Sequence, residues 1–124
     1  MVSGSPVPAN GIGASSIIVS AQLDFVYIVD TQSNEISQFK YGPATGLLTS
    51  LSPATISTGS SPVSGGITSD GSFVIVPDSG GSDLAVFRVA NGASSTGTAP
   101  TGLLSRASTP TVTLASQPTT VIVR

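Results

Sequence analysis

One pattern of apolar and polar positions occurs twice along the chain. In each copy an apolar run ends in an aspartate, four turn-forming residues follow, and a second apolar-rich segment begins at an acidic residue and ends at a base. The first copy runs from Phe25 to Lys40 and the second from Phe73 to Arg88, a spacing of 48 residues. A repeat of about 40–50 residues built from short strands is typical of β-propeller blades.

Each copy is predicted to contain four antiparallel strands. The runs Phe25–Val29 and Phe73–Val76 are apolar without alternation, which predicts strands that are buried on both faces. A short β-branched strand is predicted at Ser16–Ser20, and the third strands of the two copies are predicted at Glu35–Tyr41 and Asp83–Val89. The fold class is therefore all-β, with about two propeller blades in the chain.

The fourth strands are predicted at Leu47–Ile56 and Leu103–Leu114, and each contains a proline, Pro53 or Pro110. Because proline inside a strand is tolerated at a sheet edge, these strands are expected to be the outermost of each blade. The residues expected to form the tight turns are glycines and one aspartate: Gly46, Asp70, Gly71 and Gly102.

The repeat also predicts how the chain is divided. Residues 1–13, rich in Gly, Pro, Ser and Ala, are expected to form a flexible arm; residues 14–63 form the first blade and residues 64–119 the second. The last residues repeat the start of a blade, so residues 120–124 are expected to be a strand that completes a neighbouring blade. An insertion within 91–100 is expected to be an exposed loop.

Composition narrows the function. The chain has 124 residues, only 8% of them charged, and a net charge of −2 with four scattered bases. Nucleic-acid binding is not expected, because it requires clustered Lys and Arg. No apolar run is long enough to span a membrane, and the N-terminus does not resemble a signal peptide. The chain is therefore expected to be soluble, and the sequence does not indicate its cellular compartment.

The chain contains neither cysteine nor histidine. Disulfides, Cys or His zinc ligands, a cysteine nucleophile and a Ser-His-Asp triad within one chain are therefore excluded. No cofactor is expected. Calcium, which prefers oxygen ligands, is the metal that the available side chains could bind.

Three segments resemble the lactonase-type seven-bladed propeller family, which includes 6-phosphogluconolactonases, muconate-lactonising enzymes and surface proteins with YVTN-type repeats. They are Val26–Phe39, Pro43–Thr49 and Thr58–Phe73. The resemblance implies a propeller blade, and the family contains both enzymes and binding proteins. The chain differs from the family in length, because family members have about seven blades and this chain has about two.

Two blades alone would leave an apolar sheet face exposed at each end. Since propellers have about 4–8 blades, the chain is expected to form a cyclic homo-oligomer, and a trimer with six blades is favoured. The alternatives are a fragment of a longer propeller and an engineered or ancestral-type unit.

Four charged residues are candidates for a site at the mouth of the propeller channel. Asp30 and Asp78 end the two apolar runs, and the structural interpretation is that each accepts backbone N–H groups in the turn that follows. The functional interpretation is a ring of carboxylates that binds a cation or a polar ligand. Lys40 and Arg88 end the third strands, as rim charges or as an anion-binding ring.

Two functions follow from these observations. The first is a non-enzymatic propeller-forming module that assembles with itself and acts in binding or scaffolding. The alternative is a lactone hydrolase or lactonising enzyme whose site is built at the channel from several subunits. Without histidine, acid–base catalysis would fall to Asp or Glu, with Arg binding the anion.

Overall fold

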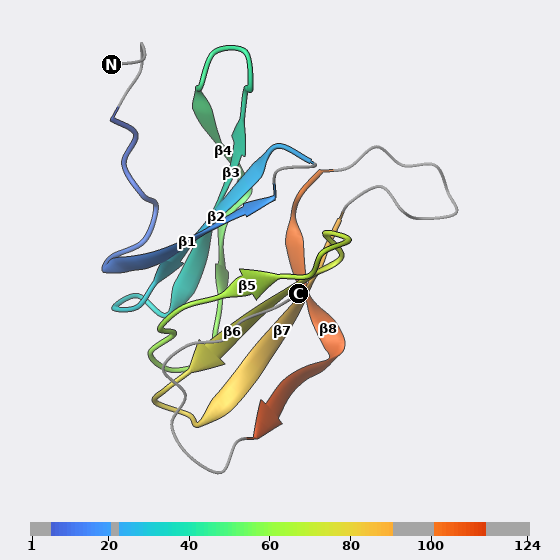
Figure 1. The fold of residues 1–124 in the computed structure, drawn as a ribbon. Helices are drawn as coiled ribbons and strands as arrows, with labels where there is room; N and C mark the ends of the chain where they lie inside the picture. The colour runs from blue at the N-terminus through green and yellow to red at the C-terminus, as the bar shows by residue number, and fades with distance from the viewer. Residues whose placement is uncertain (1–5, 21–22, 91–100, 114–124) are drawn as a thin grey trace.

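The protein folds into two four-stranded antiparallel sheets that lie face to face (Figure 1). The computed structural model describes residues 6–20, 23–90 and 101–113. The first sheet has the order β1-β2-β3-β4 and the second the order β5-β6-β7-β8. The predicted all-β architecture of propeller blades is confirmed, and the described residues contain no helix that could cross a membrane.

Within each sheet the strands follow one another in chain order, as in a meander. The first sheet consists of β1 (Ala14–Ser20), β2 (Phe25–Asp30), β3 (Glu35–Tyr41) and β4 (Leu48–Ser57). The second consists of β5 (Gly66–Ile67), β6 (Phe73–Asp78), β7 (Asp83–Val89) and β8 (Leu104–Thr113). The predicted bounds of the third strands agree with β3 and β7, because turn residues and an acidic residue mark where each begins.

The hairpins that join the second and third strands have the same register in both sheets. Asp30 pairs with Glu35 in the first sheet, and Asp78 pairs with Asp83 in the second. Each four-residue turn ends in a residue with positive φ, which is 58° at Asn34 and 56° at Ser82. The repeat in the sequence is therefore also a repeat in backbone conformation.

The fourth strands β4 and β8 lie at sheet edges, as their prolines predict. Both pair with the third strand through a register shift, which occurs between Ser37 and Phe39 in β3 and between Ala85 and Phe87 in β7. The predicted loop at 91–100 and the predicted final strand at 120–124 lie outside the described residues, as does the end of the predicted second blade.

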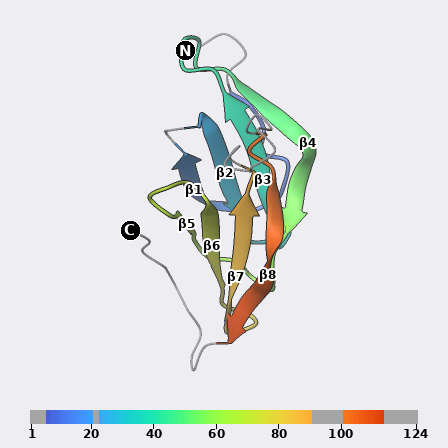
Figure 2. The same cartoon turned by 90° about the vertical axis from the view of Figure 1, so that its right-hand side faces the viewer.

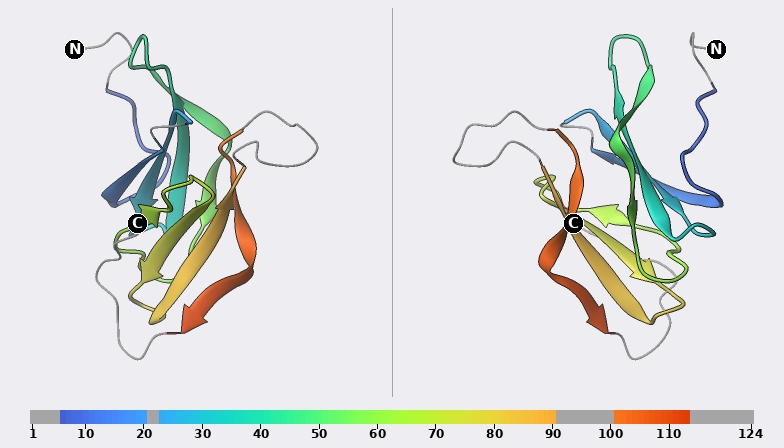
Figure 3. Two further views of the ribbon diagram at one scale, coloured as in Figure 1. Left: turned by 45° about the vertical axis from the view of Figure 1, so that its right-hand side comes forward. Right: turned by 180° about the vertical axis from the view of Figure 1, so that it is seen from behind.

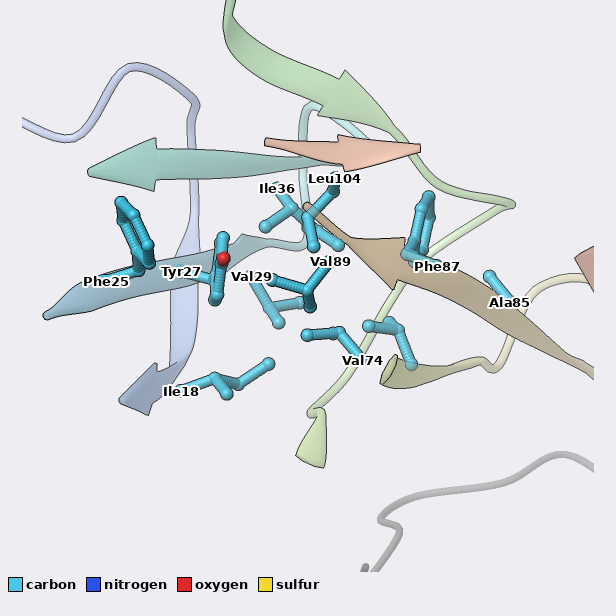
Figure 4. Packing of buried hydrophobic residues seen from close by; sticks show 11 residues of the cluster. Ile18, Phe25, Tyr27, Val29, Ile36, Val74, Ala85, Phe87, Val89 and Leu104 are labelled. Carbon is cyan, nitrogen blue, oxygen red and sulfur yellow. The ribbon is translucent and has the colours of Figure 1, made fainter. Parts of the chain in front are cut away.

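The hydrophobic core lies between the two sheets. Figure 4 shows side chains of β1, β2 and β3 directed toward those of β6, β7 and the start of β8. The members of this cluster are Ile18, Phe25, Tyr27, Val29, Ile36, Val74, Val76, Ala85, Phe87, Val89 and Leu104. Figure 2 and Figure 3 show the same two layers from the side and from behind.

The two apolar runs differ in how deeply they are buried. In β2 the residues on both faces are buried or nearly so, which confirms the prediction for Phe25–Val29. In β6 the expectation of burial on both faces is wrong: Val74 and Val76 are buried, whereas Phe73 and Ile75 are only half-buried. Val74 and Val76 point toward the first sheet, whereas Phe73 and Ile75 lie on the opposite face of β6.

A glycine at the start of β8 allows the sheets to approach each other closely. Gly102 is buried and has a φ of 73°, and a Cβ built on it would overlap with the ring of Phe25. Gly46 occupies the equivalent place before β4, with a φ of 74°, and is exposed. The two glycines therefore share the same backbone requirement but differ in packing.

These two glycines give a matched test of the packing between the sheets. Gly46→Ala is expected to lower the free energy of unfolding by about 1 kcal/mol, because alanine is strained at positive φ. Gly102→Ala is expected to cost about 1–3 kcal/mol more, because the Phe25 ring must also move. Urea denaturation at low protein concentration measures both, and equal losses would show that the Phe25 contact does not limit the approach of the sheets.

Candidate functional site

Asp30 and Asp78 are buried at the ends of β2 and β6, and each has 0% of its surface exposed. The Ser37 hydroxyl donates a 2.5 Å hydrogen bond to Oδ2 of Asp30. The same Ser37 oxygen accepts the backbone N–H groups of Asn10 and Gly11, at 3.2 and 3.1 Å. The Asp30 carboxylate therefore holds, through Ser37, the segment that precedes the first sheet.

Asp78 holds the equivalent segment before the second sheet, without an intermediate. The backbone N–H of Gly59 donates to Oδ2 of Asp78 at 3.1 Å, and a Cβ on Gly59 would lie 2.7 Å from that oxygen. Gly11 lies against the Asp30 carboxylate in the same way. Gly11 and Gly59 are 48 residues apart, so the repeat begins earlier in the chain than the apolar pattern indicates.

The expected partner of the two aspartates is thus corrected. The turn that follows each aspartate donates its N–H groups to backbone carbonyls of the preceding segment. Thr31 and Gln32 donate to Gly13 and Ile12, while Ser79 and Gly80 donate to the equivalent Ser61 and Ser60. In each blade the aspartate and its turn therefore bind the segment that leads into the sheet.

These bonds also differ from the expectation of a flexible arm over residues 1–13. Asn10 donates to Ser37 and, through its side chain, to Ser50 at 3.0 Å, and Ile12 donates to the Ser33 hydroxyl at 2.9 Å. Residues 10–13 are therefore anchored to the first sheet along its hairpin turn, while residues 1–5 lie outside the described part of the chain.

One oxygen of each buried aspartate, Oδ1, has no hydrogen-bond partner among the described residues. Burial raises the pKa of the Asp30 carboxyl, the Ser37 hydrogen bond lowers it, and the charge of Glu35 raises it again. Burial likewise raises the pKa of Asp78 to about 6; the Gly59 N–H and the charge of Arg106 lower this pKa, and the charge of Asp83 raises it. A buried carboxyl with one unpaired oxygen favours the protonated form.

Lys40 and Arg88 lie at the other end of the same hairpins. Lys40 pairs with Phe25, and Arg88 pairs with Phe73. Asp30 and Asp78 lie five residues after these phenylalanines, which is about 17 Å along the strand at the usual rise per residue. Both basic side chains are exposed, and the guanidinium of Arg88 lies 5.0 Å from the centre of the Phe73 ring. The structure therefore does not bring the acidic and basic candidates together within one chain.

No group of three or more Asp and Glu side chains among the described residues is arranged to hold a metal ion. Calcium binding by Asp30 and Asp78 stays a prediction that would need oxygen ligands from elsewhere. Asp30 and Asp78 belong to different sheets and each is enclosed in its own blade. In the described residues their role is structural: Asp78 accepts the Gly59 N–H of its entry segment directly, and Asp30 is linked to its entry segment through Ser37.

Two buried polar side chains that the sequence analysis did not single out connect the sheets. The hydroxyl of Tyr27 donates to the Gly102 carbonyl at 2.6 Å, and burial raises the Tyr27 pKa. Gln38 accepts the N–H of Leu104 at 2.7 Å and donates to the Pro53 carbonyl at 3.1 Å. The only signal in the sequence is a glutamine inside an otherwise buried strand, which must find partners because unpaired buried amides are costly.

The fold is that of lactonase-type propeller blades. It is similar to the structure of a 6-phosphogluconolactonase-like protein of Bacteroides fragilis, with a TM-score of 0.75 and 20% identity over 91% of this chain and 30% of that one. For a similar protein of Bacteroides uniformis the TM-score is 0.70 and the identity 18%, over 86% of this chain and 28% of that one. For the periplasmic gluconolactonase of Pseudomonas aeruginosa the TM-score is 0.64 and the identity 22%, over 82% of this chain and 26% of that one.

No family model and no curated protein matches the sequence. The chain spans less than a third of the length of each of these three structures, and the identities of 18–22% show a common fold rather than a common activity. The resemblance inferred from the repeated motifs is therefore confirmed for the fold.

The buried Asp78 predicts how stability depends on pH. Its pKa is about 6 in the folded chain and 3.8 ordinarily, so the folded state binds the proton more tightly than the unfolded state. The free energy of unfolding is expected to fall as the pH rises from 3.8 to about 6. Asp78→Asn, which keeps an acceptor for Gly59, is expected to flatten this decline in urea denaturation series.

Asp70→Asn is the matched control for that series. The Asp70 carboxylate is exposed and accepts hydrogen bonds from Thr68 and Ser72, which lower its pKa. Its contribution to stability is therefore lost as the pH falls, the opposite of Asp78. If Asp78→Asn and Asp70→Asn change the pH profile in the same way, the buried carboxyl is not the group responsible.

Proposed function

We propose that this chain is a propeller-forming repeat module that assembles with copies of itself into a closed ring and acts through that ring in binding or scaffolding. The observation that supports the proposal is the apolar character of both outer sheet faces. On the first sheet Ile17 is 63% and Val19 47% exposed, and on the second sheet Phe73 and Ile75 are half-buried.

These faces are costly to leave in water. Ile18 points into the core, so the alternation along β1 directs the exposed Ile17 and Val19 to the opposite face, beside the half-buried Ile28 and the buried Val26. On the second sheet Val74, Val76, Ala85 and Phe87 point into the core, which directs Phe73, Ile75, Leu84 and Val86 outward. Exposed and half-buried apolar side chains gathered on one sheet face are typical of protein interfaces.

A ring is the arrangement that covers both faces at once. Stacking the first sheet of one copy on the second sheet of the next is a head-to-tail contact, and such contacts end only in a closed ring or an open filament. Two blades per chain make a trimer with six blades the favoured ring, within the usual range of about 4–8. The ring would surround a channel whose loops are available for a ligand.

The second candidate function is lactone hydrolysis at the assembled channel. The observation that favours it is the fold of the gluconolactonase of Pseudomonas aeruginosa and of the two Bacteroides proteins. Without histidine, proton transfer would depend on Asp or Glu side chains of several subunits, with Arg88 or another arginine for the anion. Asp30, Asp78 and Lys40 remain candidates for the mouth of this channel.

Native mass spectrometry tests the proposed assembly. The expected species contains three chains of 12.2 kDa, and its population should rise with protein concentration. A chain that stays monomeric at every concentration would contradict self-assembly and would favour a unit that stacks on further blades of a longer protein.

A lactonase assay on the isolated oligomer separates the two functions. If the ring acts only in binding or scaffolding, hydrolysis of aldonolactones should not exceed the uncatalysed rate. The matched control is the Asp78→Asn and Arg88→Ala pair of variants assayed on the same oligomer fraction. Turnover that is lost in either variant would support the enzymatic alternative.

A further inference from the structure

Resting on the proposed self-assembly, we propose that Phe73 of one copy packs against Gly46 of the next copy, and that this contact forms the joint between subunits. In this joint the outer face of the second sheet in one copy packs on the outer face of the first sheet in the next copy. The argument starts from the joint inside the chain, where the same two kinds of face are already in contact.

Inside the chain, two contacts between a large side chain and a glycine bring the sheets together. The Phe25 ring of β2 lies on Gly102, where no Cβ could be accommodated. Ile18 of β1 lies on Gly65, just before β5, where an added Cβ would be 2.6 Å from Cδ1 of Ile18. The strands β1 and β5 are in contact at this point.

The first of these contacts has an unused copy on the outer faces. Phe73 lies 48 residues after Phe25 and begins β6 as Phe25 begins β2. Gly46 lies two residues before β4 as Gly102 lies two residues before β8, and their positive φ angles are 74° and 73°. Gly46 is exposed, and Phe73 is half-buried beneath the Arg88 guanidinium, which lies 5.0 Å from the centre of its ring and must move aside for a second chain.

The contact between Ile18 and Gly65 also has an equivalent on the outer faces, but there the isoleucine and the glycine are each shifted by one position of the repeat. The repeat places Gly66 of β5 at the position of Ile18, and it places Ile17 of β1 at the position of Gly65. A second copy would therefore bring its Ile17, which is 63% exposed, over a glycine. One isoleucine and one glycine meet in either joint, so the volume to be filled is conserved.

The joint between copies differs from the internal one in polarity. The internal joint contains the hydrogen bonds of Tyr27 and Gln38 to the start of β8. The repeat replaces these residues by Ile75 and Val86 on the outer face of the second sheet. At these positions the subunit joint is therefore apolar where the internal joint is hydrogen-bonded, and the association of the chains should tighten in sulfate.

The test compares variants of the full chain by analytical ultracentrifugation. Phe73→Ala is expected to weaken self-association at least tenfold, because it removes the central aromatic anchor of the joint. Thr49→Ala is the control: Thr49 is exposed and pairs with Lys40 on the face of the first sheet that carries Phe25 and is turned toward the second sheet, so self-association should not change. Circular dichroism verifies that both variants remain folded.

Cross-linking tests the same joint without relying on a loss of association. The chain has no cysteine, so Phe73→Cys and Leu47→Cys each introduce a single thiol, and Leu47 is the 42% exposed neighbour of Gly46. A short bismaleimide should link the two variants when they are mixed, and should not link either variant to itself. The product is identified by mass spectrometry of the linked peptides.

The outcomes separate this inference from the proposed function. Weakened association in Phe73→Ala together with a link between positions 73 and 47 supports the joint. An oligomer that persists unchanged in Phe73→Ala, or that gives no such link, overturns the joint while leaving self-assembly intact. A wild-type chain that never associates overturns the proposed assembly and this joint with it.

Discussion

The structure depends on one constraint: a sheet with apolar side chains on both faces needs other parts of the protein to cover both faces. The chain meets it once, where Phe25, Tyr27 and Val29 of the first sheet pack on Val74, Val76 and Phe87 of the second. Close approach is possible because Gly102 leaves room for the Phe25 ring. On the outer faces Ile17 and Val19 of the first sheet are exposed, and Phe73 and Ile75 of the second sheet are half-buried, and the proposed assembly rests on these positions.

Polar groups determine how the two sheets are placed on each other. Each aspartate at a strand end binds the segment leading into its blade, Asp30 through Ser37 and Asp78 directly through the Gly59 N–H. Tyr27 and Gln38 bind the backbone at the start of β8 across the core. Apolar burial supplies the driving force, whereas these buried bonds specify one arrangement, because any other would leave them unpaired.

The likeness to lactonase-type propellers concerns this scaffold and not its chemistry. The blade recurs because its alternating strands and turns solve a packing problem that is independent of any substrate. The charged residues at equivalent positions of the two blades lie at opposite ends of the hairpins, and each aspartate is enclosed within its own sheet. In the described residues one chain therefore does not bring these acidic and basic side chains together.

The sequence by itself determined the blade. Apolar runs, turn residues and a 48-residue spacing specify the strands β2, β3 and β7 nearly to the residue, because strand and turn formation depend on local pattern. Only the tertiary structure decided which faces are covered, since Phe73 and Phe25 look alike in sequence and differ in what lies against them. It also decided that Asp30 and Asp78 hold the preceding segments and that Gln38 joins the sheets, because hydrogen-bond partners distant in the chain are chosen by packing and leave no local pattern.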